Sequence, residues 1–276
     1  ADPRPLIEEF RATFDRAVDL RLQADVPVVS YLSGGIDSAA VLVAASRIMG
    51  RPLPSFTIKI EAKGYDETDR AMQAARLAGS RPTVVPCDGP TLSAVYPKLV
   101  EAADCPVIDT ACAALYCLAG EVHRQGYKVA LTGEGADEAL AGYPWFKTFK
   151  LMHLLDAGPF RPSSMIRRIV RRVAAPRTPY SELLKVESYL GGRFAPMDLY
   201  HMMRSTRRWV YRDETAEQLG DYLAVQELDL DQDRLKRWAP LNKSLYFGYK
   251  TILRSEEHTS ELQSHSDLVC RLLLEK

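Results

Sequence analysis

Residues 26–38 read VPVVSYLSGGIDS, a run of apolar and β-branched residues that leads into two adjacent glycines. Such a run is typical of a strand that is buried on both faces of a parallel sheet. The apolar stretch 39–49 follows, which is long enough for a helix and ends before Gly50. Residues 26–50 therefore predict a buried strand, a glycine-containing loop and a helix in direct succession.

The same alternation continues through the first half of the chain. Hydrophobic patterns predict further strands at 55–60, 82–86 and 127–132, and helices at 4–24, 67–78, 91–103 and 110–124. This order indicates an α/β fold, with a parallel sheet and helices on both of its faces. Clear strand signals stop after about residue 150. We therefore expect an α/β core over 1–150 and a truncated helical portion over 151–253.

The composition excludes several classes of protein. The 276 residues include 36 Lys plus Arg and 36 Asp plus Glu, so the formal net charge is zero. We therefore do not expect a dedicated nucleic-acid binder, which usually has a basic excess. No apolar run approaches the length of a membrane span, about 18 consecutive residues, so we do not expect a membrane protein either. The five cysteines include no Cys-x-x-Cys pair, so we expect reduced thiols in a cytoplasmic protein. The arginine-rich segment 161–173 fits a solvated helix face better than an anion- or RNA-binding patch.

The first glycine loop, SGGIDS at 33–38, has the features of a phosphate-binding loop. Adjacent glycines allow a close approach to a ligand and expose backbone amides, and the next helix adds its positive N-terminal end. Ser33 and Ser38 supply hydroxyl donors. Asp37 would repel phosphate, so we expect Mg²⁺ between the two. The loop lacks the lysine of a Walker A motif, and a purely structural glycine turn with a serine or aspartate cap remains an alternative.

The second loop, LTGEGADE at 131–138, also follows a predicted strand. Its two glycines permit tight backbone turns, and three acidic residues lie within five positions. Packed carboxylates destabilise one another unless a cation or a basic group compensates them. Both loops should lie at the carboxyl edge of the sheet, where α/β proteins bind ligands. A polar turn that caps a helix is the alternative interpretation of this second loop.

Taken together, the two loops strongly resemble those of the N-type ATP pyrophosphatases. Within that superfamily, residues 4–253 resemble the synthetase domain of glutamine-dependent asparagine synthetases. The matching segments are SGGIDS at 33–38, GYDE at 64–67, DCP at 104–106 through Asp109-Thr110, GEGADE at 133–138 and AGYPWF at 141–146. At Asp109-Thr110 the chain departs from the family, whose members more often have proline and serine after that aspartate.

This resemblance implies a site for ATP and Mg²⁺ made from both loops. The implied cofactor-binding residues are Leu32, Ser33, Gly34, Gly35, Asp37, Ser38, Ile58, Thr132 and Gly133. Asp37 and Asp137 would hold Mg²⁺, and Glu134 would be the catalytic residue that positions ammonia or takes its proton.

The resemblance also implies a ligase activity. ATP would activate aspartate as β-aspartyl-AMP with release of diphosphate, and ammonia would then displace AMP to give asparagine. Two alternatives stay open. One is another ATP-dependent amidotransferase of the same fold, either β-lactam synthetase-like or peptide-modifying, and the other is an inactive nucleotide-binding fragment.

The chain departs from the family at both ends. Family enzymes begin with a glutaminase domain whose nucleophile is an N-terminal cysteine, whereas the first cysteine here is Cys87. We therefore expect a glutaminase domain in the full-length protein and no release of ammonia from glutamine by this chain. Residues 254–264, RSEEHTSELQS, resemble an in-frame translation of a common sequencing-library adapter. We expect 254–276 to be non-native and the downstream basic residues of the family to be missing.

Overall fold

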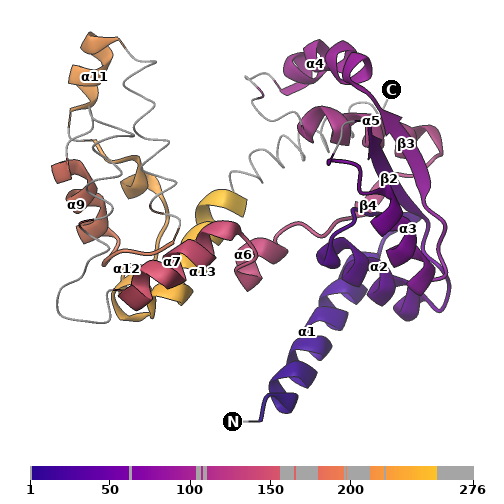
Figure 1. The fold of residues 1–276 in the computed structure, drawn as a ribbon, viewed down its shortest axis with the longest axis horizontal. Helices are drawn as coiled ribbons and strands as arrows, with labels where there is room; N and C mark the ends of the chain where they lie inside the picture. Colours follow the sequence, from indigo (N-terminus) through magenta and orange to yellow (C-terminus); the bar gives the residue numbers. More distant parts are fainter. Residues whose placement is uncertain are drawn as a thin grey trace. The chain divides into compact units, whose positions relative to one another are not determined.

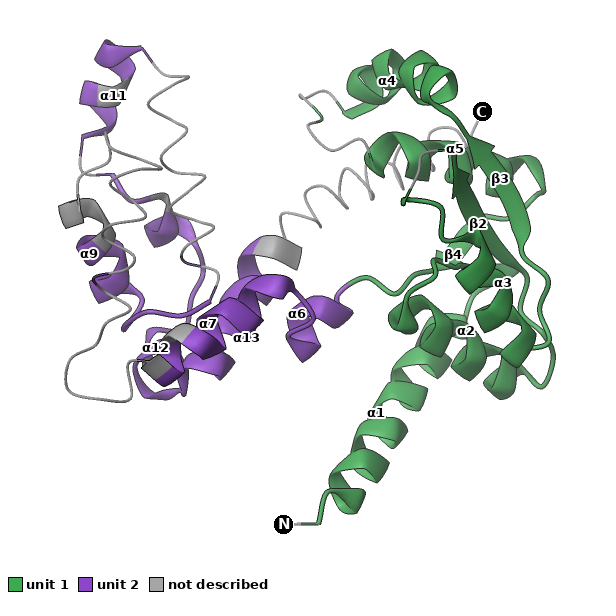
Figure 2. Cartoon of the chain, in the orientation of Figure 1, with its two compact units in different colours: residues 1–134, 255–276 green, residues 135–254 purple. Residues whose placement is uncertain are grey.

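The computed structural model describes residues 2–61, 64–103, 107, 111–155, 165, 180–195, 197, 212–220 and 222–253. They fall into two compact units, with the division between Glu134 and Gly135 (Figure 2). Several segments that the sequence singles out lie outside the described residues. These are 104–106, 109–110, the arginine-rich segment 161–173 apart from Met165, and the tail 254–276.

Unit 1, residues 1–134, contains a parallel four-stranded sheet in the order β3-β2-β1-β4. The strands are β1 (Val28–Tyr31), β2 (Ser55–Ile60), β3 (Thr83–Cys87) and β4 (Val129–Leu131). The helices of this unit are α1 (Arg4–Leu22), α2 (Ile36–Met49), α3 (Thr68–Leu77), α4 (Gly89–Ala103) and α5 (Ala111–Arg124). The predicted α/β fold with a parallel sheet is confirmed (Figure 1).

Helices cover both faces of the sheet. Side chains alternate between the faces along a strand, so neighbouring residues of β1 enter different cores. Val28 packs with the buried residues of α2 and α3, including Leu42 and Ala71. Val29 packs with Leu118 of α5 on the opposite face. This double burial explains why the strand reads as an unbroken apolar run.

The order of the strands creates a switch point beside β1. The chain runs from β1 to β2 and β3 on one side, and then returns to place β4 on the other side of β1. Ser30 pairs with Ser55 of β2 and with Leu131 of β4, so β1 is central. Ligands of open α/β sheets bind beyond the carboxyl ends of the strands at such a point. The loops after β1 and β4 flank this position.

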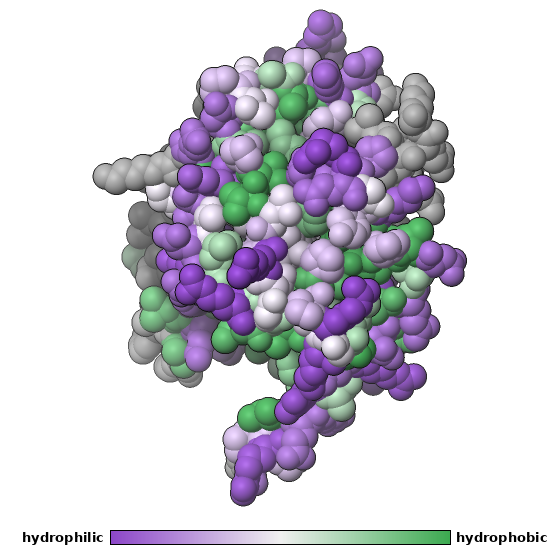
Figure 3. Space-filling view, turned by 90° about the vertical axis from the view of Figure 1, so that its right-hand side faces the viewer, coloured by the Kyte–Doolittle hydropathy of each residue, from purple (hydrophilic) through white to green (hydrophobic). Residues whose placement is uncertain are grey.

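Helix α1 packs along only part of its length. Val18 is buried with α2, and Arg47 of α2 forms an ion pair with Asp15. The side chains nearer the N-terminus, Leu6 and Ile7, are 68% and 60% exposed. In Figure 3 the projecting helix shows apolar side chains among polar ones. The predicted helix is therefore present, but the first part of its apolar stripe lies outside the core.

Unit 2, residues 135–254, is helical in its described residues. Its elements are α6 (Ala136–Leu140), α7 (Pro144–Leu155), α9 (Tyr180–Tyr189), α11 (Asp213–Leu219), η1 (Ala224–Glu227), α12 (Gln232–Arg237), α13 (Pro240–Gly248) and η2 (Tyr249–Leu253). A separate core includes Leu190, Phe194 and Phe247, and the rings of the two phenylalanines meet edge to face at 5.2 Å. No helix in the described part of the chain is long and apolar enough to cross a membrane.

Replacement of Leu42 by alanine should destabilise the protein by about 2–5 kcal/mol, because the side chain is fully buried and its loss leaves a cavity. Leu77→Ala is the matched control, since Leu77 is 79% exposed and its loss should change the free energy of unfolding by no more than about 0.5 kcal/mol. Urea unfolding of both variants measures the difference. Equal losses would contradict the placement of α2 against the sheet.

Candidate functional site

The two serines of the first loop hold it in a closed conformation. The Ser33 and Ser38 hydroxyls are 2.9 Å apart, and the Ser33 N–H donates to the Ser38 Oγ at 3.1 Å. The Gly35 N–H donates to the Ser33 Oγ at 3.2 Å. These hydroxyls therefore have a structural role in the loop, in addition to the phosphate-donor role that the sequence predicts for them.

The N-terminus of α2 has no side-chain cap. The helix begins at Ile36, inside the SGGIDS motif, whereas the apolar stretch alone predicts a start at residue 39. Gly35 is the extended N-cap residue, with φ −82° and ψ 157°, and it has no side chain that could bond the first-turn amides. Asp37 and Ser38 lie in the first turn as a result. An uncapped N-terminus carries partial positive charge and favours an anion nearby.

The second loop packs directly on this helix terminus. A Cβ atom at Gly133 would lie 2.7 Å from the Ser38 amide nitrogen and 3.0 Å from the Asp37 carbonyl carbon. Real side chains do not approach so closely, so only glycine fits here. Beside it, the Thr132 Oγ1 accepts the Glu134 N–H at 3.4 Å. Unit 1 therefore brings Thr132 and Gly133 to the loop that contains Asp37 and Ser38.

Two of the implied cofactor-binding residues, Leu32 and Ile58, belong to neighbouring strands or strand ends. Leu32 is 2% exposed, and its N–H donates to the Phe56 carbonyl at 2.8 Å. Ile58 lies further along β2, opposite Val85 of β3, and is partly buried against the core under α5. Leu32 lies directly after β1 and leads into the first loop, whereas Ile58 lies within the neighbouring strand β2, and the contact of both with a nucleotide remains a prediction.

Asp137 lies in unit 2, beyond the division between the units. Its carboxylate lies against Gly142, since a Cβ there would be 1.7 Å from the Asp137 Oδ1. The Gly142 N–H also donates to the Asp137 carbonyl at 3.0 Å. The helix α6 that carries Asp137 has only five residues and lies between Gly135 (φ +85°) and Ala141 (φ +59°), both left-handed. The proposed pairing of Asp37 and Asp137 at one metal ion therefore stays a prediction.

The described residues contain no cluster of three or more His, Cys, Asp or Glu side chains that could hold a metal ion. Mg²⁺ often binds through one or two carboxylates and takes its other ligands from phosphate and water. Asp37, in a turn whose amides favour anions, fits an ion that is shared with a polyphosphate.

Glu138 has a structural role that the sequence did not assign to it. Its side chain is buried, with 2% exposure, and its Oε1 accepts a hydrogen bond from the Tyr143 hydroxyl. The Tyr143 ring stacks on Trp145 with 4.1 Å between centroids. A buried carboxylate is costly without such a partner. The motifs at 133–138 and 141–146 are thus joined by a hydrogen bond from Tyr143 to helix α6, which also carries Asp137.

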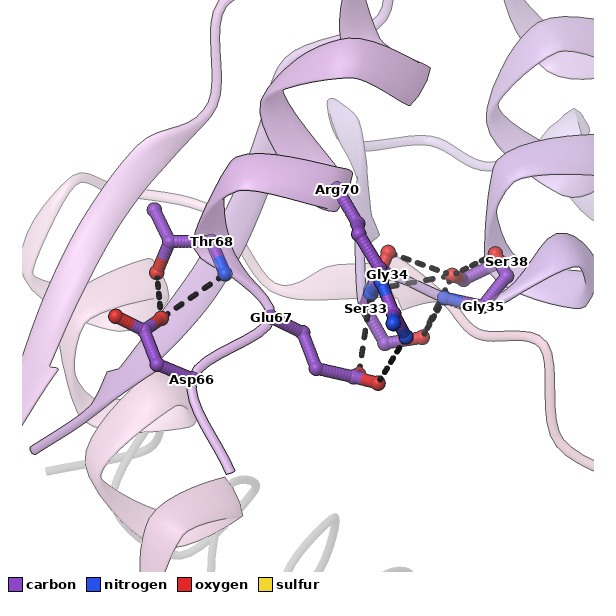
Figure 4. Close-up of polar contacts among 8 residues, drawn as sticks. All are labelled: Ser33, Gly34, Gly35, Ser38, Asp66, Glu67, Thr68 and Arg70. Atoms are coloured by element: carbon purple, nitrogen blue, oxygen red, sulfur yellow. Dashed lines mark hydrogen bonds and ion pairs between the residues drawn. The ribbon is translucent and has the colours of Figure 1, made fainter. Parts of the chain in front are cut away.

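Glu67 is a second residue that the sequence did not place at the site. Its Oε2 accepts the Gly34 N–H at 3.2 Å from a position 33 residues away (Figure 4). Asp66 fixes the start of α3 by accepting from the Thr68 amide at 3.0 Å and from the Thr68 hydroxyl. The hydroxyl and then the amide hold the pKa of the Asp66 carboxyl below its usual value. The GYDE segment therefore brings α3 against the first loop.

A buried thiol ends β3 at the carboxyl edge of the sheet. Cys87 is fully buried, and burial, followed by the neighbouring Cys117 thiol, raises the pKa of Cys87 to about 12. At neutral pH the thiol is therefore protonated and is a poor nucleophile.

The model of the asparagine synthase family matches residues 9–260. A putative glutamine-hydrolysing asparagine synthetase of Mycobacterium tuberculosis is 35% identical over 169 residues, which cover 61% of this chain and 25% of that protein. Glutamine-hydrolysing asparagine synthetase 1 of Bacillus subtilis is 33% identical over 171 residues, 62% of this chain and 26% of that protein. The amidase chry2 of Gibberella zeae is 27% identical over 283 residues, 90% of this chain and 40% of that protein. The matches thus span about a quarter to two fifths of these relatives.

Replacement of Gly133 by alanine should destabilise unit 1 by about 1–3 kcal/mol, because the new methyl group must displace the backbone at Ser38. Gly120→Ala in α5 is the matched control. A Cβ there meets nothing within 4 Å, and alanine favours a helix interior by up to about 1 kcal/mol. Thermal melts should show opposite shifts for the two variants. A Gly133→Ala protein as stable as the wild type would refute the close contact of the loops.

The buried thiol of Cys87 predicts a loss of stability in alkali. An unfolded thiol ionises near pH 8.5, whereas the folded one ionises at about 12. Between these values the folded state binds more protons than the unfolded state, so stability falls as pH rises, by at most about 1.4 kcal/mol per pH unit. Urea unfolding at pH 8 and pH 10 should show a larger loss for the wild type than for Cys87→Ala. Parallel losses would mean that Cys87 does not titrate in this way.

Proposed function

The chain belongs to the asparagine synthase family, and we propose that it uses ATP to activate a carboxylate for conversion into an amide. Aspartate is the proposed carboxylate and asparagine the proposed product. The observation that carries this proposal is the contact of Gly133 with the N-terminus of α2. This contact joins the two loops that follow adjacent strands, and it leaves an uncapped helix terminus between them.

The first step would be adenylation. An oxygen of the aspartate side-chain carboxylate attacks the α-phosphorus of ATP, the bond from that phosphorus to the bridging oxygen breaks, and pyrophosphate leaves. The amide of Gly34 and the terminus of α2, where Gly35 is the N-cap residue, would stabilise the negative charge on the leaving group. Mg²⁺, held by Asp37 and Asp137, would neutralise further charge on the phosphates.

The second step would be amide formation. The nitrogen of ammonia attacks the acyl carbon, the carbon–oxygen bond to AMP breaks, and a proton leaves the nitrogen. Glu134 is the proposed acceptor of that proton, or the group that positions ammonia. It lies directly after Gly133 in the second loop, which supports this assignment.

The source of ammonia is proposed to be a glutaminase domain in the full-length protein. Two of the relatives named above are described as glutamine-hydrolysing, and this chain matches only about a quarter of each. The thiols of Cys87 and Cys117, which are free cysteines in the described part of the chain, support a reducing compartment, and we propose the cytoplasm.

A second candidate function is the formation of a different amide by the same chemistry. The relative that matches 90% of this chain is named an amidase, so a carboxylate other than aspartate is a specific alternative. An inactive nucleotide-binding fragment is the third possibility. The adenylation step distinguishes all three, because it requires both ATP and the correct carboxylate.

Aspartate-dependent exchange of labelled pyrophosphate into ATP should therefore occur if the chain carries out the adenylation step.

Replacement of Asp37 by asparagine should weaken the binding of ATP–Mg²⁺ about tenfold, roughly 1.4 kcal/mol, because it removes a proposed ligand of the metal ion. Isothermal titration with ATP, with and without Mg²⁺, measures the binding. Asp19→Asn on an exposed part of α1 is the control for the loss of one negative charge.

The outcomes separate the candidates. Exchange with another carboxylate but not with aspartate would favour the second function, and ATP binding without any exchange would favour the inactive fragment. Unchanged affinity of Asp37→Asn for ATP–Mg²⁺ would contradict the metal-binding role of Asp37.

A further inference from the structure

The backbone amide of Gly34 differs from its neighbours in the first loop. The amides of Ser33 and Gly35 donate to serine hydroxyls of the loop itself, at 3.1 and 3.2 Å. The Gly34 amide instead donates to the Glu67 carboxylate, which comes from the start of α3. The Gly34 amide is thus directed away from the hydroxyls of the loop, and the carboxylate of Glu67 accepts its hydrogen bond.

The first turn of α3 lies directly over this loop. A Cβ at Gly34 would be 2.8 Å from the Arg70 Cβ and 3.0 Å from the Glu67 Cβ. The stems of both side chains therefore contact Gly34 itself, so their charged ends are within reach of any group that binds its amide. Figure 4 shows Glu67 and Arg70 on the same side of the loop.

The ion pair between these two side chains is weak. The Arg70 Nη1 is 3.9 Å from the Glu67 Oε1, and the side chains are 74% and 47% exposed. Exposed pairs of this kind contribute little to stability and are screened by salt. Both partners can therefore exchange to other ligands at a small cost in free energy.

The charges around the loop oppose a polyphosphate. Asp37 lies in the first turn of α2, and Asp66 and Asp69 flank Glu67 at the start of α3. Arg70 is the cation that the same turn of α3 brings to the loop. An incoming phosphate would repel Glu67 and attract Arg70, so it would replace the Glu67 carboxylate as the anion beside Gly34 and Arg70.

We infer that Glu67 acts as an internal anion that occupies the pyrophosphate position on Gly34, and that its displacement by polyphosphate frees Arg70 to bind the phosphates. This inference rests on the proposed function, since it assigns roles at the same ATP site. Glu67 is a competitor that limits affinity, and Arg70 is a specificity-determining residue for the phosphate chain of the nucleotide. No covalent step is involved.

The experiment compares Glu67→Gln and Arg70→Gln in the full chain by isothermal titration with inorganic pyrophosphate and Mg²⁺, and with ATP and Mg²⁺. Glu67→Gln keeps the shape of the side chain but removes its charge, and it should tighten pyrophosphate binding about threefold. Arg70→Gln should weaken it about fivefold. Both effects should shrink at 0.5 M salt, because these charges are exposed.

Matched controls remove the same charges elsewhere in unit 1. Glu8→Gln in α1 and Arg76→Gln in α3 change exposed residues that the structure does not place on Gly34, and they should leave pyrophosphate affinity within about 1.5-fold of the wild type. Adenosine binding should be unchanged in all four variants, because adenosine has no phosphate. Thermal melts verify that the variants are folded.

The results distinguish the inference from the proposed function. If Glu67→Gln binds pyrophosphate with the same or lower affinity, Glu67 is a structural support of the loop and the inference is wrong, although the ATP site stands. Affinity of Arg70→Gln equal to that of the wild type would likewise refute the role of Arg70. Failure of the wild type to bind either ligand would refute both the proposed function and the inference.

Discussion

The close approach of Gly133 to the amide of Ser38 is the constraint on which the rest of the site depends. The loops that follow β1 and β4 meet at the beginning of α2, so closely that no side chain fits between them. The parallel pairing of these two strands places both loops at the same edge. The buried faces of the sheet fix that pairing, since Val28 and Val29 enter separate cores. The packing of unit 1 thus determines where positive backbone charge is exposed.

The polar groups near this helix terminus divide into two kinds. The hydroxyls of Ser33 and Ser38 bond within the loop and define its shape. The carboxylate of Glu67 comes from another element and binds an amide that the loop itself leaves available. Internal bonds of the first kind are part of the fold, whereas the second kind can be exchanged for a ligand. A bond of the first kind also occurs in unit 2, where the buried Glu138 of α6 accepts from the Tyr143 hydroxyl.

The sequence predicts the strands well because each is a short apolar run bounded by turn residues. The predicted strand 55–60 coincides with β2, and the predicted helix 4–24 differs from α1 only at its end. Helix α2 begins at Ile36, earlier than the apolar stretch predicts, because Gly35 is its extended N-cap residue and the polar residues Asp37 and Ser38 belong to its first turn. The Glu67–Gly34 bond joins positions 33 residues apart. Its prediction requires the strand order and the start of α3, which local patterns do not contain.

Gly142 shows how two positions of the site constrain each other's evolution. The carboxylate of Asp137 fills the space that any side chain at 142 would need. A substitution at 142 therefore displaces the acidic group, and the glycine is required only while that group keeps its present orientation. The two positions should change together in diverging lineages, so that loss of the glycine accompanies loss of the carboxylate. A relative that retains the carboxylate without the glycine would need a different orientation of that carboxylate or a different path of the backbone between α6 and α7.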